Sequence, residues 1–143
     1  MTPDELKAKL ELHLRYLRGE PEGVRLNLAG ARLPHFQLCP EGTIIGWKKL
    51  QDGLVACLEI GPNIRRTSSL VGRKCRAESA LVIGIYDEAG KEVGAGKSLH
   101  REEFQYETGA VVVPDYYNDD IRVECASGIH FFITREEAEQ YEG

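Results

Sequence analysis

The chain has 143 residues, of which 42% are hydrophobic and 29% are charged, and its formal net charge is −5 at pH 7. This composition fits one folded domain, residues 1–143, and excludes a fibrous, low-complexity or disordered chain. The acidic balance disfavours duplex nucleic acid, and no apolar run approaches the ~20 residues that span a bilayer. Because the first residues lack a basic and then apolar leader, we expect a cytoplasmic protein, in the host cytoplasm if it is viral.

Residues 3–18 are predicted to form the first element, an amphipathic helix. Thr2 can cap it, Pro3 fits the first helical position, and Glu5 completes a Thr-x-x-Glu capping box. One face then carries leucines at a spacing of three and four residues: Leu6, Leu10, Leu14 and Leu17. This stripe should dock either on the body of the domain or on a second copy, which would make the protein a homo-oligomer through its N-terminal helix.

Residues 24–39 show a five-residue period that fits neither a helix nor a flat strand. Leucines recur every five residues, and a second apolar series follows the same period: Leu28, Leu33 and Leu38, then Leu26, Ala31 and Phe36. Such a period is typical of a square coil built from pentapeptide units. The units are too few to complete a turn, so we predict a degenerate pentapeptide-like ledge on another β structure.

Residues 43–133 are predicted to be a β body made of short runs between turn residues. The candidate strands are Thr43–Lys49, Leu54–Ile60, Arg73–Arg76, Leu81–Tyr86, Phe104–Tyr106, Ala110–Val113, Ile121–Cys125 and Ile129–Ile133. A second capping box, Thr134 to Glu137, predicts a short C-terminal helix over residues 135–141. The expected fold is therefore mainly β (α+β), a compact β domain flanked by two helices.

The segment from Ile60 to Ala77 contains no Asp or Glu, although the chain as a whole is acidic. It carries five cations around a hydroxyl-rich run, Thr67 to Ser69: Arg65, Arg66, Arg73, Lys74 and Arg76. Guanidinium groups beside small hydroxyl residues suit an anion that is recognised by shape as well as charge. The alternative is structural: Arg73, Lys74 and Arg76 could pair across adjoining strands with carboxylates, namely Asp115, Asp119, Asp120 or Glu124.

Three motifs carry a family resemblance: Gly46–Leu50 (GWKKL), Arg73–Ala77 (RKCRA) and Cys125–Ala138, which contains GIHFFITREEA. In their order along the chain they resemble the C-terminal domain of phage and bacterial pentapeptide-repeat proteins, a domain of unknown function. The resemblance implies a prokaryotic or viral origin, and it supplies no catalytic residues. The long repeat region of that family is nearly absent here, which argues against imitation of a DNA duplex.

Other motifs do not support catalysis or metal binding. Gly94–Ser98 resembles the end of a P-loop, but Lys91 stands where the pattern requires glycine, so the segment is predicted to be a mobile turn. The cysteines, Cys39, Cys57, Cys75 and Cys125, include no Cys-x-x-Cys pair and are expected to remain thiols. We therefore predict no enzyme, no metal and no cofactor.

We predict a small binding protein that sequesters a phosphorylated, nucleotide-like signal molecule, an anti-defence sink of phage origin. Arginines would grip phosphate, serines would donate hydrogen bonds, and an aromatic ring would stack a base. His130 lies in an apolar strand where alternation can turn it toward a pocket. The predicted ligand contacts are Trp47, Arg65, Arg66, Ser68, Ser69, Arg73, Lys74, Arg76, Tyr106 and His130. The alternative is a scaffold module that binds a protein partner.

Overall fold

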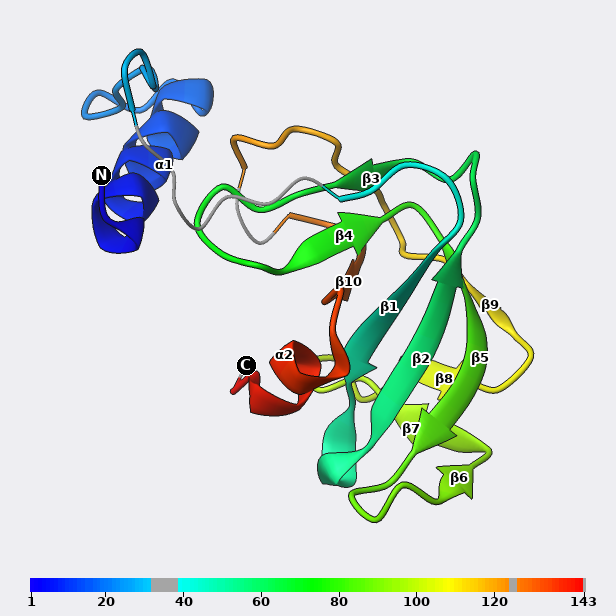
Figure 1. Cartoon of the computed structure of the whole chain (residues 1–143). Helices are drawn as coiled ribbons and strands as arrows, with labels where there is room; N and C mark the ends of the chain where they lie inside the picture. Colours follow the sequence, from blue (N-terminus) through cyan, green and yellow to red (C-terminus); the bar gives the residue numbers. More distant parts are fainter. Residues whose placement is uncertain (32–38, 124–125, 143) are drawn as a thin grey trace.

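The computed structural model describes residues 1–31, 39–123 and 126–142, and within them the protein is mainly β with helices near both ends (Figure 1). The largest sheet is antiparallel and contains β1 (Ile44–Lys49), β2 (Val55–Ile60), β5 (Ala80–Tyr86), β6 (Glu92–Val93) and β9 (Val111–Val112). In this sheet β2 lies between β1 and β5, while β6 and β9 pair with opposite ends of β5. The predicted mainly β fold class is thus confirmed.

Smaller sheets lie beside the main one. One sheet has the order β10 (Ile129–Phe131), β4 (Cys75–Ala77) and β3 (Arg66–Thr67), and another pairs β7 (Ala95–Lys97) with β8 (Gln105–Glu107). β1 connects both of them to the main sheet. Trp47 and Phe132 exchange backbone hydrogen bonds of 2.7 Å, and Leu50 forms a β-bridge with Ser98.

The core lies where these sheets meet. Its largest fully buried side chains include Leu58, Ile60, Val82, Ile85, Tyr106 and Phe131. Gly46 lets β1 approach this core closely, because a Cβ atom at Gly46 would lie 2.4 Å from the ring carbon Cδ2 of Phe131. Side chains two residues apart in a strand share a face, so Lys48 follows Gly46 toward β10.

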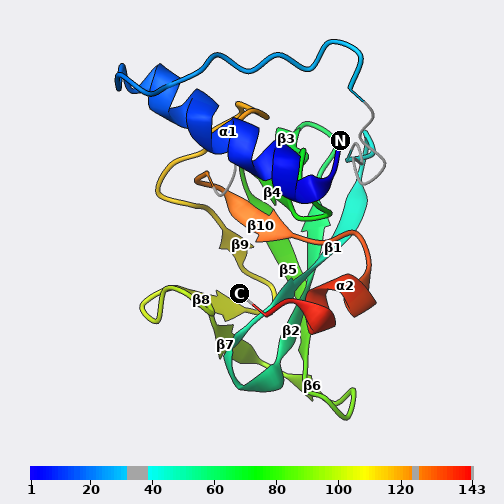
Figure 2. The ribbon, with the colours of Figure 1, turned by 90° about the vertical axis from the view of Figure 1, so that its left-hand side faces the viewer.

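The N-terminal helix, α1 (Pro3–Leu17), begins with the predicted capping box. The Glu5 amide donates to Thr2 Oγ1 at 3.1 Å, and the Thr2 amide donates to Glu5 Oε2 at 2.9 Å. Leu6 and Leu10 are buried against Leu70, and Figure 2 shows α1 lying across the end of the molecule that carries β3 and β4. Leu17 is 47% exposed, so only the first half of the leucine stripe docks on the domain.

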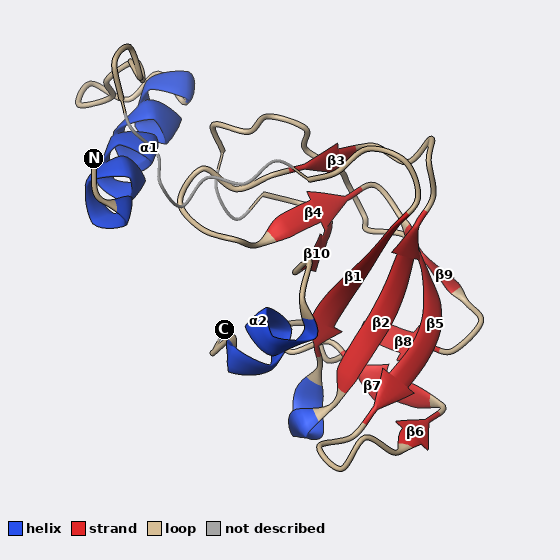
Figure 3. Cartoon of the chain, viewed as in Figure 1, coloured by secondary structure: helices blue, strands red, loops and turns tan. Residues whose placement is uncertain are grey.

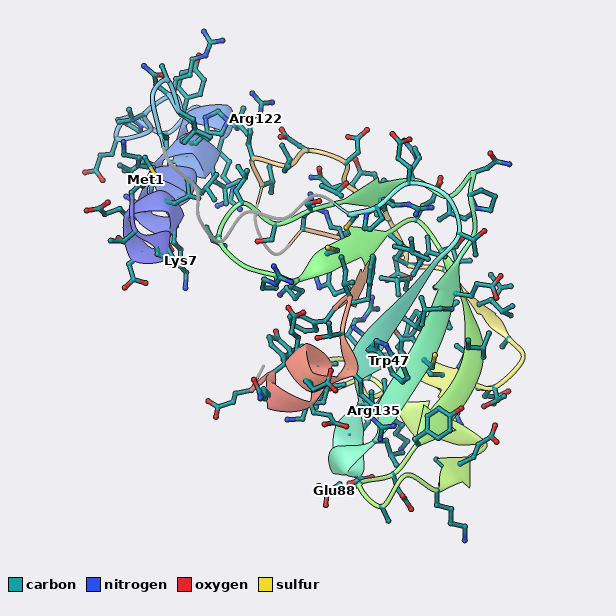
Figure 4. All side chains as sticks on the ribbon, in the orientation of Figure 1. Met1, Lys7, Trp47, Glu88, Arg122 and Arg135 are labelled. Atoms are coloured by element: carbon teal, nitrogen blue, oxygen red, sulfur yellow. The ribbon has the colours of Figure 1, made fainter. Side chains whose placement is uncertain are left out.

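The C-terminal helix, α2 (Arg135–Gln140), matches its prediction to within one residue. It begins at Thr134, whose hydroxyl accepts a hydrogen bond from the Glu137 amide at 3.3 Å. The Arg135 guanidinium lies 5.7 Å from the centroid of the Trp47 ring, and both side chains are labelled in Figure 4. Among the described residues, no helix has the length and apolar character needed to cross a membrane.

The predicted secondary structure needs correction at three places (Figure 3). Residues 121–123 form a turn, so the predicted strand Ile121–Cys125 is wrong there, and its last two residues lie outside the described ranges. The predicted mobile turn Gly94–Ser98 contains β7, and a Cβ atom at Gly96 would lie 2.8 Å from Leu50 Cδ1. Arg66 and Thr67, for which no strand was predicted, form the short strand β3.

Part of the predicted pentapeptide-like ledge, residues 32–38, lies outside the described ranges. The described part, residues 24–31, contains neither helix nor strand. The Ala29 amide donates to Asn27 Oδ1 at 2.9 Å, and Gly30 has a φ of 72°, as expected in a tight turn. Leu26 and Leu28 pack against the apolar cluster under α1.

Candidate functional site

The basic segment is largely built into the fold, and Arg66 shows this most clearly. Its guanidinium donates to the carbonyl oxygens of Ile64, Pro40, Gly42 and Gly61 at 3.2, 2.9, 2.7 and 2.6 Å. These carbonyls belong to the segments before β1 and between β2 and β3. Arg66 therefore holds two loops together with donors that the sequence analysis had assigned to a ligand.

The other arginines of the segment also have internal partners. Arg76 is buried and donates to the carbonyls of Asn118 and Asp120, each at 2.7 Å. Arg73 forms an ion pair of 2.9 Å with Glu137 of α2. Arg65 pairs with Glu78 at 3.0 Å, and this exposed pair raises the pKa of Arg65 and lowers that of Glu78, mainly through their hydrogen bond.

The serines of the hydroxyl run are buried rather than presented to solvent. Ser68 Oγ accepts a hydrogen bond from the Cys39 amide at 2.8 Å. Ser69 Oγ accepts from the amides of Val71 and Gly72 at 3.2 and 3.1 Å, which shapes the turn before β4. Trp47 is half-buried and faces Arg135 instead of a cavity. These three predicted contacts, like the arginines above, therefore have partners within the domain.

A cleft lies instead beside β1, β8 and β10. It consists of a hollow of about 310 Å³ and an adjoining one of about 30 Å³, which share Lys48, Ser98, His100 and His130. We call the two hollows together the Lys48 cleft. Its remaining lining residues are Lys49, Lys74, Leu99, Arg101, Phe104, Tyr106, Pro114, Asp115, Tyr116, Ala126, Ser127, Gly128, Ile129, Phe132 and Tyr141.

Lys48 is the central cation of this cleft. Its Nζ donates to the carbonyl oxygen of His130 at 3.1 Å and lies 6.0 Å from the centroid of the Tyr106 ring. Burial of the ammonium, aided by the nearby charge of Lys74, lowers the pKa of Lys48 from 10.5 to about 8. None of the ion pairs between described residues includes Lys48, so its charge faces the cleft without a carboxylate partner there.

His130 lies beside Lys48 because of the alternation in β10. Ile129 and Phe131 point into the core, and His130 between them lines the cleft. Its Nε2 lies 2.7 Å from the Ala126 carbonyl oxygen, and since a carbonyl only accepts, Nε2 carries the proton and Nδ1 is an acceptor. Burial, with the charges of Lys74 and Lys48, lowers the pKa of His130 from 6.5 to about 4.

This lowered pKa predicts an acid-sensitive fold. Between pH 6.5 and 4 the unfolded chain binds a proton at His130 that the folded chain does not, so the free energy of unfolding falls as the pH drops through this range. In urea titrations at pH 7 and pH 4, wild type should lose about 2–3 kcal/mol more than His130→Gln, which keeps an N–H for the Ala126 carbonyl. Equal losses in the two proteins would contradict the prediction.

The other polar groups define the ends of the cleft. Lys74 Nζ lies 3.5 Å from the Tyr141 hydroxyl and 5.3 Å from the centroid of its ring. Tyr106 is buried, which raises its pKa and keeps it neutral at pH 7. Arg101 at the rim is paired with Asp115 at 2.6 Å. Lys48 and Lys74 are thus two cations among the residues that line the cleft.

The structure thus brings together three of the predicted ligand contacts, Lys74, Tyr106 and His130. Lys48, Ser98 and His100 also line the cleft and are not among the predicted contacts. The sequence could have indicated Lys48, because in a strand it shares a face with Gly46, and a lysine on an inward face is uncommon. The sequence gives no such indication of His100, since it follows β7 in a segment whose place in the fold depends on long-range pairing.

The profile of one protein family matches residues 35–138, more than two thirds of the chain, and it is described as "Family of unknown function (DUF5758)". The chain belongs to this family. The DUF5758 match begins after α1 and includes every lining residue of the Lys48 cleft except Tyr141. No curated protein and no solved structure matches the chain.

Proposed function

We propose that this DUF5758 domain binds a phosphorylated, nucleotide-like ligand in the Lys48 cleft and does not transform it. The observation that carries the proposal is the half-buried Lys48, which lies near Lys74, lines the hollow and forms none of the ion pairs between the described residues. Burial is the main cause of the lowered pKa of Lys48, and repulsion by the nearby charge of Lys74 adds to it. A phosphate between them would relieve this repulsion and gain strength from the low local dielectric.

The rest of the cleft suits the remaining parts of such a ligand. The larger hollow, about 310 Å³, falls in the size range of small-molecule sites and is bordered by the rings of Phe104, Tyr106 and Tyr116. Aromatic rings can stack a base, while the Ser98 hydroxyl and the His130 ring offer directional hydrogen bonds for phosphate or sugar. Simple capture requires no general acid, base or metal.

The resemblance to domains of phage and bacterial pentapeptide-repeat proteins supports a role as an anti-defence sink that sequesters a host nucleotide signal. A sink gains capacity when several copies assemble. Leu12, Tyr16 and Leu17 of α1 remain exposed and could contact a second copy. The homo-oligomer stays a prediction, which the molar mass from sedimentation equilibrium would check.

Thermal denaturation against a ligand panel tests the proposal directly. Cyclic dinucleotides, cyclic trinucleotides and ADP-ribose derivatives should be compared with inorganic phosphate and with unphosphorylated nucleosides. A ligand present at 100 times its Kd and bound only by the folded state should stabilise the domain by about 2.7 kcal/mol. Replacing Lys74 by Met should remove the shift, while the exposed Lys97→Met on β7 should keep it.

The scaffold alternative has one observation in its favour. Val111, Val113 and Tyr116, in and after the edge strand β9, are 63%, 58% and 66% exposed. An apolar edge of this kind suits a protein partner. A scaffold predicts no stabilisation by any member of the ligand panel, so a panel without a single shift would overturn ligand capture and leave this alternative.

A further inference from the structure

Cys39 and Cys75 are brought side by side by residues of three segments. β3 and β4 are antiparallel, with Arg66 opposite Ala77 and Thr67 opposite Arg76, so the next position along β3, Ser68, comes opposite Cys75. The Cys39 amide donates to Ser68 Oγ at 2.8 Å, and the Cys39 side chain packs against the core cluster that contains Cys75. The register of β3 and β4 therefore positions the two thiols against each other.

Cys39 has the properties of an attacking thiol, and Cys75 has those of a resolving thiol. Their side chains are hydrogen-bonded, and this bond lowers the pKa of Cys39 while raising that of Cys75. Ser68 and the charge of Arg66 also lower the pKa of Cys39, whereas burial opposes them. Cys39 is half-buried, and Cys75 is 2% exposed. A peroxide would therefore reach Cys39 first, and Cys39 has the larger thiolate fraction.

We propose that Cys39 and Cys75 are a reversible oxidation site that closes to a disulfide under a two-electron oxidant of the peroxide class. The Cys39 thiolate attacks one peroxide oxygen, the O–O bond breaks, and Cys39 becomes a sulfenic acid as the departing hydroxide takes a proton to form water. The Cys75 sulfur then attacks the Cys39 sulfur, and the sulfenic hydroxyl leaves with the Cys75 proton as a second water. The dithiol is oxidised and the peroxide is reduced; an external thiol reverses the change.

This bond would tie β4 to the chain that enters β1, and both strands bear on the Lys48 cleft. β4 pairs with β10, which carries His130, and β1 carries Lys48. The disulfide would close a loop over residues 40–74 and reduce the conformational freedom of the unfolded chain. Oxidation should therefore raise the melting temperature of the full chain by about 10 °C. The inference does not depend on what the cleft binds.

The test treats the purified full chain with hydrogen peroxide and follows intact mass, free-thiol titration and peptide mapping without reduction. The expected product has lost two hydrogen atoms, contains a Cys39–Cys75 crosslinked peptide and has the higher melting temperature, and dithiothreitol reverses all of these changes. Mapping of wild type alone decides the connectivity, so the result does not depend on whether a variant folds.

Variants then assign the roles of the sulfurs. The Cys57→Ala variant should still form the Cys39–Cys75 disulfide, because Cys57 lies in β2 and burial raises the pKa of its thiol. Cys39→Ser should form neither the link nor the thermal shift, and Cys75→Ser should stop at the sulfenic acid, which dimedone traps on Cys39. A crosslink that involves Cys57 or Cys125, a bond between two chains, or retention of both thiols at Cys39 and Cys75 would overturn the proposal.

Discussion

Replacing Arg66 by Ala is expected to lower the free energy of unfolding by about 2–3 kcal/mol, because charge-assisted hydrogen bonds to several backbone carbonyls are lost together. The Arg66 guanidinium contacts the carbonyls of Ile64, Pro40, Gly42 and Gly61 from one planar group. The first and last of these contacts are partly buried, so water replaces the lost donors there only in part. Urea denaturation of the ligand-free domain measures the loss.

The neighbouring residue provides a matched control. Arg65 is 59% exposed on its side chain and pairs with Glu78 and Asp119 on the surface, so Arg65→Ala should cost less than about 1 kcal/mol. Arg66→Lys should recover less than half of the loss, because one ammonium cannot reach carbonyls on both loops. If Arg66→Ala instead left stability unchanged and abolished a ligand-induced shift, the ligand site would lie at residues 65–69, as the sequence suggested.

The arginines of the basic segment have partners that the sequence alone does not reveal. A cluster of arginines with no acidic residue nearby in the sequence predicts an anion-binding site. The sequence pattern does not show that backbone carbonyls can be the partners instead. Arg66 and Arg76 are both held by carbonyls, and those of Arg76 belong to residues 118 and 120, far along the chain. The tertiary fold decides which backbone carbonyls accept no hydrogen bond within the sheets and can therefore accept one from an arginine.

Elements with strong local signals were predicted well. α1 and α2 have capping boxes, and β1, β2 and β5 are long enough to show alternation or continuous apolar runs. β3 and β6 contain two residues each and carry no period that could be read. β7 contains Gly96, which local rules assign to a turn, but here the glycine leaves room for the Leu50 side chain, which a Cβ atom would crowd.

The Lys48 cleft could not be predicted from local sequence rules either, because it depends on contacts between segments far apart in the chain. Lys48 and His130 meet through a hydrogen bond between positions 82 residues apart. In β10, alternation with the buried Ile129 and Phe131 places the His130 side chain on the face away from the core. In β1, the same alternation places Lys48 on the face of Gly46, which is directed toward the core. What the sequence could not provide is the Trp47–Phe132 bridge, which brings β1 beside the end of β10 and so places Lys48 near the His130 carbonyl.

Replacing Lys48 by Met should make the ligand-free domain more stable while abolishing ligand binding, and this pair of opposite effects identifies a cation kept for function. Because the pKa of Lys48 is about 8 in the folded chain and 10.5 ordinarily, the protonated form at pH 7 costs the fold about 3 kcal/mol. Met fills similar space without a charge. After the hydrogen bond to the His130 carbonyl is lost, the net gain should be about 2 kcal/mol.

The pH dependence gives this prediction a second, independent readout. Between pH 8 and 10.5 the unfolded chain holds a proton at Lys48 that the folded chain has released, so wild-type stability should rise with pH there relative to Lys48→Met. Affinity for a phosphorylated ligand should move the other way, weakening up to about tenfold for each pH unit above 8 as the free protein loses the ammonium. The exposed Lys97→Met should match wild type in both measurements. A Lys48→Met protein that is less stable than wild type and still binds the ligand would show that Lys48 supports the fold and that the ligand site lies elsewhere.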